Sequence, residues 1–550
     1  MSIPLLAGNP DCTPASFSRF VLPFAYQLTP AYLPELKRAG QPSEVGSWDH
    51  VPRWVLWDDS DAQSALELGA QVTLDQRKRY FTSETAEVLF GSRTMRFRLQ
   101  CPTQAIGPVT VQVDGVAAQL ETPELLLFEC APFGKRGADP MRIGLLVLSV
   151  HFTGNALQLD QLLKFNEAFR NMRQPYVGHA GAPDLTQVTW LKQLNLRSES
   201  TRECADAPYL KLWLDLLEAP LVLTEKNAPY YLYSNCLAQI ARGGSYLRSP
   251  LIHADYRAFT WTAAVCEGGA LVLNKPSSDQ ANRDEPSVLE RWLQGLKSKS
   301  ETRAEKTGQK PAESHGWLRL LNVDGPGWQG APPHSEPVPA GFHGDWLRDH
   351  TYFRWAPQCL YGFTPHSGAA FVSVQRDPPI WNHFRRLYFD QLCLMLYVRG
   401  TIFGFSRDIS ALSRKIQVDR GGASHFNRLE RQFSLFTNLY QFPLLSNQQQ
   451  SLEMYAALRK ALDINDFYDE VQDEIRHMAS MFDRRHDRDI RMIGVAIALI
   501  ATIGTLWGDM DLGAWLVGTL GLNPLLAFFV MLLPLVLTVF GGLAWMKRRD

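Results

Sequence analysis

Two long uncharged apolar segments lie close together near the C-terminus of this 550-residue chain. Met492–Trp507 carries no charged residue over 16 positions, and Leu525–Met546 carries none over 22. A helix needs roughly 17–25 apolar residues to cross a bilayer core of about 30 Å, and its backbone groups must be paired within the segment. The pattern predicts a C-terminal transmembrane hairpin, in which the first span is short unless it extends through Gly508. The alternative is a buried apolar hairpin in a soluble domain.

Basic residues flank both segments, whereas the connecting loop 508–524 contains none. Cytoplasmic flanks of membrane helices are enriched in Lys and Arg. We therefore expect an inner (plasma) membrane protein with several spans, both termini in the cytoplasm and the loop outside. The N-terminus has no signal-peptide pattern, in agreement. The basic ring expected at the membrane interface consists of Arg488, Arg491, Lys547, Arg548 and Arg549.

Composition excludes several classes of function. The formal net charge of −1 gives no electrostatic basis for nucleic-acid binding. The eight cysteines form no CxxC pair, which is typical of a reducing cytosol and not of a zinc ribbon or a disulfide framework. No phosphate-binding, dinucleotide-binding or nucleophile-elbow motif occurs. We expect no enzyme activity, no organic cofactor and no nucleic-acid partner.

The first 380 residues alternate between strand-like and helix-like segments. The apolar, β-branched segment 142–152 predicts a buried strand, and the helical spacing of apolar residues over 157–172 predicts a helix after it. Residues 1–380 are therefore expected to form a cytosolic α/β domain. The charged segment 276–316 is poor in large apolar residues and is interpreted as a mobile insertion.

Residues 381–491 are predicted to form a helical stalk. One long helix begins near 381, a second covers about 424–440, and a third begins near 447 with Ser446 as its N-cap. No Pro or Gly interrupts residues 444–493, so the third helix should run unbroken into the first apolar segment. Its apolar seam, spaced as in a short coiled coil, consists of Val471, Ile475, Met478 and Phe482.

This arrangement resembles the CorA-type divalent-cation (Mg²⁺) transporter superfamily. The resemblance implies an α+β cytosolic domain followed by long stalk helices and a two-helix transmembrane hairpin over 492–550. It also implies a homopentamer in the lipid bilayer whose first membrane helices line a pore. The superfamily's Gly-x-Asn signature, usually Gly-Met-Asn, is absent at its expected place, where Gly508-Asp509-Met510 stands. A literal match, Gly521-Leu522-Asn523, begins the second segment instead.

Small residues in the first apolar segment fall on one helical face at spacings of 4, 3, 4 and 3. We interpret this face as lining a pore with carboxylates at its mouth, which would concentrate cations. Packing of small residues against a neighbouring helix and a solvated loop Asp are the alternatives. The predicted ion path consists of Gly494, Ala498, Ala501, Thr505, Gly508, Asp509, Asp511 and Asn523.

Two further groups could bind metal. Asp466, Asp469, Glu470 and Asp473 form an acidic face on the third helix, which the resemblance makes a regulatory site for a divalent cation; a solvated helix face is the alternative. Histidine and Asp side chains gather over 334–366 without the spacing of a known zinc motif, so they either bind Zn²⁺ or fill irregular structure. They are His334, His343, His350 and His366 with Asp345 and Asp349.

The leading hypothesis is a CorA-like homo-oligomeric channel for divalent cations, Mg²⁺ before Co²⁺, Ni²⁺ or Zn²⁺. The second is a membrane-anchored sensor or effector that couples a cytosolic signal to membrane permeability, which the large front domain and the altered tripeptide favour. A third is an oligomeric scaffold without transport.

Overall fold

The structure is a computed structural model in which two compact units, 1–471 and 472–550, are described separately. The described residues are 4–8, 14–27, 53–56, 74–91, 94–100, 109–113, 116–121, 123–128, 141–154, 157–170, 257–266, 312–325, 346–355, 359–373, 378–418, 423–440, 445–509, 517–519, 521, 523 and 526.

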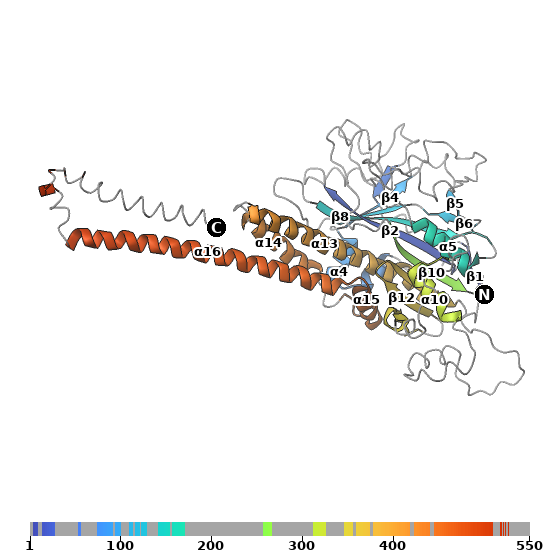
Figure 1. The fold of residues 1–550 in the computed structure, drawn as a ribbon. Helices are drawn as coiled ribbons and strands as arrows, with labels where there is room; N and C mark the ends of the chain where they lie inside the picture. Colours follow the sequence, from blue (N-terminus) through green and yellow to red (C-terminus); the bar gives the residue numbers. More distant parts are fainter. Residues whose placement is uncertain are drawn as a thin grey trace, which may run out of the picture. The chain divides into compact units, whose positions relative to one another are not determined.

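The first unit is built on an 11-stranded sheet (Figure 1). Its main path runs β11-β12-β13-β10-β2-β8-β7-β4-β3. β10 and β13 pair in parallel, and the other described neighbours are antiparallel. The strands are β2 Phe17–Gln27, β3 Arg53–Leu56, β4 Thr94–Gln100, β5 Val109–Val113, β6 Val116–Leu120, β7 Glu124–Phe128, β8 Met141–Phe152, β10 Phe259–Cys266, β11 Thr351–Tyr352, β12 Cys359–Thr364 and β13 Ser367–Ser373, with a separate pair of β1 Pro4–Leu5 and β9 Leu157–Gln158.

The described helices are α3 Leu74–Tyr80, α4 Ser83–Phe90, α5 Leu159–Arg170, α10 Ala312–Asn322, α12 Pro378–Asn382, the π-helix η5 His383–Leu387, α13 Tyr388–Val418, α14 Ala423–Tyr440, α15 Gln449–Ala461 and α16 Ile464–Asp509. The last of these, α16, begins in the first unit and continues into the second. The strand predicted over 142–152 and the helices predicted over 157–172 and 424–440 are confirmed as β8, α5 and α14. Residues 276–311 of the predicted insertion lie outside the described residues.

β8 is long enough to carry two partners on one edge. Its first part pairs with β7 through Gly144–Val147, and its last part pairs with β6 through Val150–Phe152. The sheet therefore branches beside β8, and β5 continues the branch through β6. The other edge of β8 pairs with β2 over the full 11 residues of that strand.

The alternation of side chains along β10 assigns the helices to opposite faces of the sheet. The Thr262 hydroxyl accepts a hydrogen bond from Asn166 of α5 at 2.9 Å. The next side chain back, Trp261, stacks on Phe384 of η5 with ring centroids 4.1 Å apart. Consequently α5 covers one face and the η5–α13 region covers the other. Gly368 of β13 permits this packing, because a Cβ there would lie 2.3 Å from the indole ring of Trp261.

A π-helical segment begins the long helical region. In a π-helix the backbone bonds run from i to i+5, which changes the pairing of nearby carbonyls. The Phe384 carbonyl accepts a hydrogen bond from Trp261 Nε1 at 3.1 Å, and the Arg385 carbonyl accepts one from Arg19 Nη1 at 2.8 Å. Side chains of the sheet thereby pair with η5 carbonyls and fix the start of α13.

The prediction of one unbroken helix from about residue 447 is wrong. α15 ends at Ala461, and α16 begins at Ile464. Between them Asp463 has a φ of 52°, a left-handed conformation that Asp tolerates better than most residues. Ser446 is not the N-cap, since α15 begins at Gln449; its hydroxyl instead donates to the Tyr80 carbonyl.

The predicted transmembrane hairpin, and with it the multi-pass inner-membrane location, is corrected by the structure. Within the part of the chain that the structure describes, no helix combines the length and the apolar composition needed to cross a membrane. The uncharged part of α16, Met492–Trp507, has only 16 residues. At 1.5 Å per residue it covers about 24 Å, less than a bilayer core of about 30 Å. Leu525–Met546, apart from Leu526, lies outside the described residues.

Candidate functional site

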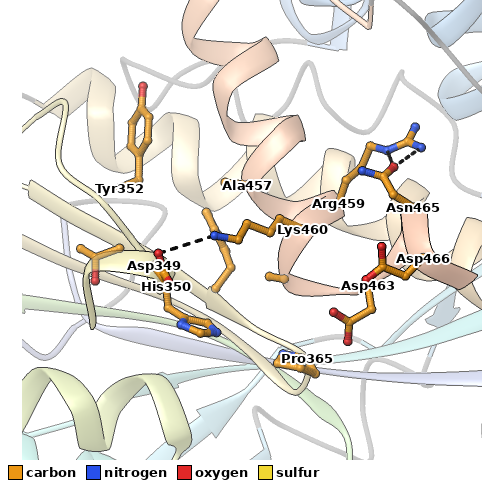
Figure 2. Close-up of a pocket in the computed structure, with 13 residues that line it drawn as sticks. Asp349, His350, Tyr352, Pro365, Ala457, Arg459, Lys460, Asp463, Asn465 and Asp466 are labelled. Carbon is orange, nitrogen blue, oxygen red and sulfur yellow. Dashed lines mark hydrogen bonds and ion pairs between the residues drawn. The ribbon is translucent and has the colours of Figure 1, made fainter. Parts of the chain in front are cut away.

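A cavity of about 400 Å³, here called the junction pocket, lies where α15 ends and α16 begins (Figure 2). Its walls come from the helical turn 346–350 and β11, from the β12–β13 turn, from the end of α15 and from the first turn of α16. The left-handed backbone at Asp463 lets α16 leave α15 at the rim of this pocket. The lining residues are Asp349, His350, Thr351, Tyr352, Phe363, Pro365, Ala457, Arg459, Lys460, Ala461, Asp463, Asn465 and Asp466.

The charged groups of the junction pocket lie on two sides. Figure 2 shows the Lys460 ammonium on one side, beside Asp349 and the His350 ring, and the carboxylates of Asp463 and Asp466 on the other, where Arg459 also lies. Lys460 Nζ lies 3.7 Å from Asp349 Oδ1, too far for a hydrogen bond. Among the described residues, neither Asp463 nor Asp466 has an ion-pair partner. The pocket therefore offers a loosely paired cation and two unpaired carboxylates.

Arg459 is held by its neighbours. Its Nη2 and Nε atoms donate to Asn465 Oδ1 at 2.6 and 2.9 Å, and Nη1 donates to the Tyr455 hydroxyl at 3.1 Å. This guanidinium joins the last turn of α15 to the first turn of α16. We interpret it as part of the wall, because most of its donors are already used.

The hydrogen bond of His350 shows which of its ring nitrogens carries the hydrogen. His350 Nδ1 lies 2.8 Å from the Trp346 carbonyl oxygen, and the two rings stack with centroids 4.1 Å apart. A carbonyl oxygen only accepts, so Nδ1 carries the hydrogen. Nε2 is therefore the ring nitrogen that remains for a ligand.

A polar triad fixes the β11 wall of the junction pocket to α15. The Tyr352 hydroxyl donates to the Glu453 carboxylate, and Arg354 Nη1 donates to Glu453 Oε1 at 2.7 Å. Burial raises the pKa of Tyr352, and the neighbouring carboxylate raises it further. The hydrogen bonds from Tyr352 and Arg354 lower the pKa of Glu453. Tyr352 therefore stays neutral and Glu453 stays ionised around neutral pH.

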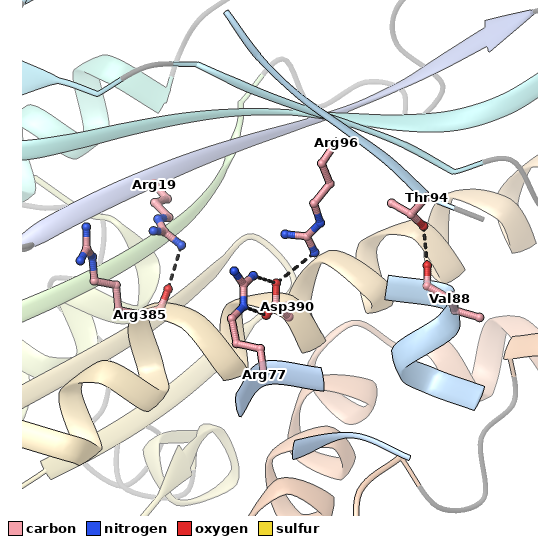
Figure 3. A network of polar contacts seen from close by, with 7 residues as sticks. All are labelled: Arg19, Arg77, Val88, Thr94, Arg96, Arg385 and Asp390. Carbon is pink, nitrogen blue, oxygen red and sulfur yellow. Dashed lines mark hydrogen bonds and ion pairs between the residues drawn. The ribbon is translucent and has the colours of Figure 1, made fainter. Parts of the chain in front are cut away.

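A second cluster, here called the Asp390 network, lies between the sheet and α13 (Figure 3). Asp390 is fully buried; Arg77 of α3 donates to its two oxygens at 2.8 and 2.5 Å, and Arg96 of β4 donates at 3.1 Å. Burial opposes ionisation of Asp390, but the two guanidinium groups outweigh burial and lower its pKa. Both guanidinium groups also lie near the Phe90 ring, 5.2 and 5.0 Å from its centroid. The network joins α3, α4 and β4 to α13.

Glu121, just after β6, lies in a related cluster of charges. Its Oε1 is 3.7 Å from Arg385 Nη2 and 3.7 Å from His151 Nδ1. Burial opposes ionisation, but the neighbouring His151 ring and the charges of Arg385 and Arg19 together lower the pKa of Glu121 from 4.5 to about 2. No residue of these two clusters lines the junction pocket.

We expect Glu121→Gln to reduce the acid sensitivity of folding. Because the pKa of Glu121 is lower in the folded state, its carboxylate stabilises the fold above pH 4.5, and that contribution is lost as the pH falls from 4.5 to about 2. The variant should lose on the order of 2 kcal/mol near neutral pH, a figure reduced for the partial exposure of the side chain. Urea unfolding across this pH range measures the effect, with the exposed Glu430→Gln as control. Parallel pH profiles for wild type and Glu121→Gln would contradict it.

The structure places the predicted pore residues along the last part of α16. Gly494, Ala498 and Ala501 are exposed, and Thr505, Gly508 and Asp509 belong to the final turns of the helix. Asn523 is described, and its carbonyl accepts a hydrogen bond from the Leu526 amide at 2.8 Å. Of the predicted basic ring, Arg488 and Arg491 lie on α16. Asp511, Lys547, Arg548 and Arg549 lie outside the described residues.

The predicted acidic face and seam of α16 differ in exposure as the sequence pattern indicates. Asp466, Asp469, Glu470 and Asp473 are all exposed. Of the seam residues, Val471, Ile475 and Met478 are buried, and Phe482 is partly buried.

The predicted histidine cluster is not brought together as a metal centre. No group of three or more His, Cys, Asp or Glu side chains suited to a metal ion occurs among the described residues. His350 and Asp349 line the junction pocket instead, and His366 lies in the β12–β13 turn. His334, His343 and Asp345 lie outside the described residues.

No protein-family model, curated protein or solved structure matches this chain. The resemblance to the CorA superfamily, the pentameric state and the transport of divalent cations therefore stay predictions, as does the expectation that the chain is not an enzyme.

Proposed function

We propose that the chain is a homo-oligomeric sensor that responds to divalent cations, with α16 as the helix through which copies associate. One observation carries this proposal: an exposed stripe of apolar and small residues on α16, spaced 4, 3 and 4 residues apart. The stripe consists of Ile490, Gly494, Ile497 and Ala501, and the two isoleucines are 54% and 61% exposed.

A stripe with this spacing is typical of helices that pair with one another. Burial of the exposed isoleucine side chains is energetically favourable. The small side chains of the stripe allow close approach of a second helix. The occupant that we propose is α16 of another copy, because two copies of one stripe match in length and spacing. The homo-oligomer expected from the CorA resemblance supports the same assignment.

The acidic face supports a cation response. Asp469 and Glu470 have no ion-pair partner among the described residues, and Asp473 pairs only with exposed Arg476, at 3.1 Å. Like charges on adjacent turns of a helix repel one another. Carboxylate oxygens are preferred ligands of Mg²⁺, and copies placed side by side would add further carboxylates. A divalent cation should therefore favour the associated state.

Sedimentation of the full chain, with EDTA and then over a range of MgCl₂ and CoCl₂ concentrations, tests the proposal. We expect association that strengthens with divalent cation. The double variant Asp469→Asn/Glu470→Gln should need about tenfold more Mg²⁺ for the same effect, corresponding to about 1.4 kcal/mol. Asp483→Asn is the matched control, since this exposed carboxylate lies on α16 about 15 Å beyond Asp473.

A second variant distinguishes the contribution of the stripe to association from that of the acidic face. Ile497→Asn should weaken association in EDTA and in Mg²⁺ alike. A chain that stays monomeric at every concentration would reject the oligomer. Association that is equal with EDTA and Mg²⁺, or unchanged in the double variant, would reject the cation response.

A further inference from the structure

We infer that the junction pocket binds a small zwitterion, a molecule with a carboxylate at one end and an ammonium group at the other. The pocket is separate from the residues Asp469, Glu470 and Ile497 on which the proposed function is tested. Its volume of about 400 Å³ falls within the roughly 300–1,000 Å³ of small-molecule sites.

The polarity of the lining selects the ligand. Lys460 offers hydrogen-bond donors to a carboxylate, since its ammonium is only loosely paired with Asp349 at 3.7 Å. On the other side, Asp463 and Asp466 offer two unpaired carboxylates to an ammonium group (Figure 2). A hydrogen bond between charged partners is stronger than one between neutral partners.

Other ligand classes match only half of this lining. A simple anion would meet Lys460 and would also face the carboxylates of Asp463 and Asp466. A simple organic cation would meet these carboxylates and leave Lys460 unused. A bare metal ion lacks a suitable set of ligands, because the described residues contain no group of three metal-binding side chains.

The chain between the two charges of the ligand should be short and apolar. Phe363, which is 2% exposed, Ala457 and Pro365 line the pocket together with the charged groups. Burial of methylene groups against such side chains is favourable. An ω-amino acid combines these features in its simplest form.

Binding would act on the α15–α16 joint. Lys460 belongs to the last turn of α15, Asp466 belongs to the first turn of α16, and Asp463 lies between them in the left-handed conformation. A ligand that contacts all three holds the two helix ends in one arrangement. The junction pocket can thereby regulate the direction in which α16 begins.

Calorimetric titration of the full chain with matched probes tests this inference. The probes are 4-aminobutyrate, butyrate and n-butylammonium, which share a four-carbon chain, together with glycine and 6-aminohexanoate to vary the distance between the charges. We expect at least one zwitterion to bind at least tenfold more tightly than butyrate and n-butylammonium. Lys460→Met and Asp463→Asn should each weaken that binding at least tenfold. Asn is suited to the left-handed position, so the second variant preserves the joint.

Lys164→Met on α5 is the matched control for the lysine variant and should bind as wild type does. Asp469→Asn/Glu470→Gln should also keep zwitterion binding, so that failure of the proposed cation response and failure of the pocket inference are distinguishable. The inference is overturned if no zwitterion binds, if n-butylammonium or butyrate binds as tightly, or if both pocket variants retain full binding.

Discussion

Replacing Asp390 by asparagine is expected to lower the free energy of unfolding by about 3–5 kcal/mol. Asp390 is 0% exposed and holds the guanidinium groups of Arg77 and Arg96 at 2.5–3.1 Å. The asparagine amide keeps the shape of the side chain but removes its negative charge. Two buried cations then lose their counter-charge, and that cost is much larger than the net contribution of the ion pair itself.

Equilibrium unfolding by urea, followed by tryptophan fluorescence, measures the effect. Asp349→Asn is the control, because its ion pair with Lys460 is exposed, and it should change stability by less than about 1 kcal/mol. The triple variant Arg77→Met/Arg96→Met/Asp390→Leu separates charge from packing. It should recover most of the loss if uncompensated charge is the cause. A loss below about 1 kcal/mol for Asp390→Asn would contradict the role given to the network.

The Asp390 network was beyond reach of sequence reasoning. Local periodicity makes Asp390 a polar position near the start of a long helix, and nothing nearby identifies a partner. Arg77 and Arg96 lie 313 and 294 positions away along the chain. Only the pairing of β4 with the rest of the sheet, together with the placement of α3 beside η5, brings the three residues together.

Elements with strong local periodicity were predictable. β8 has a long β-branched apolar run, and α5 and α14 have apolar residues at helical spacing, so their bounds agree with the sequence within two residues. The break between α15 and α16 at Asp463 was not predictable, because no Pro or Gly marks it in the sequence. A single non-glycine residue in the left-handed conformation follows the end of α15. The sequence around this residue is otherwise typical of a helix.

The junction pocket was half visible in the sequence. The sequence pattern assigns Asp349 and His350 to the histidine cluster and Asp466 to the acidic face, which are two separate predicted metal sites. Their approach depends on the contact of α15 with β12. The transmembrane prediction relied on composition alone; α16 is long, but its uncharged part is shorter than a bilayer core.

Trp261→Ala should also lower the free energy of unfolding of the first unit by about 3–5 kcal/mol. Trp261 is completely buried in β10, stacks with Phe384 at 4.1 Å and with Phe363 at 5.8 Å, and donates Nε1–H to the Phe384 carbonyl at 3.1 Å. Alanine leaves a cavity over Gly368, which has no side chain to fill it. Phe384 also loses a hydrogen bond to its carbonyl, so the start of α13 is loosened together with the sheet.

Trp261→Phe separates these two contributions, since phenylalanine keeps an aromatic ring but cannot donate. It should cost about 1–3 kcal/mol, mainly for the unpaired carbonyl. Urea unfolding followed by circular dichroism measures both variants, with Trp355→Ala at a partly buried position as control. Equal losses for Trp261→Ala and Trp261→Phe would mean that the hydrogen bond to η5 dominates. A loss for Trp261→Ala no larger than for Trp355→Ala would contradict a central role for the stacked rings.

Tyr361 stacks on the same Phe384 ring and donates to the Ile380 carbonyl at 2.9 Å. If the hydrogen bond of Trp261 dominates, Trp261 and Tyr361 are the two donors that together hold α12 and η5 on the sheet.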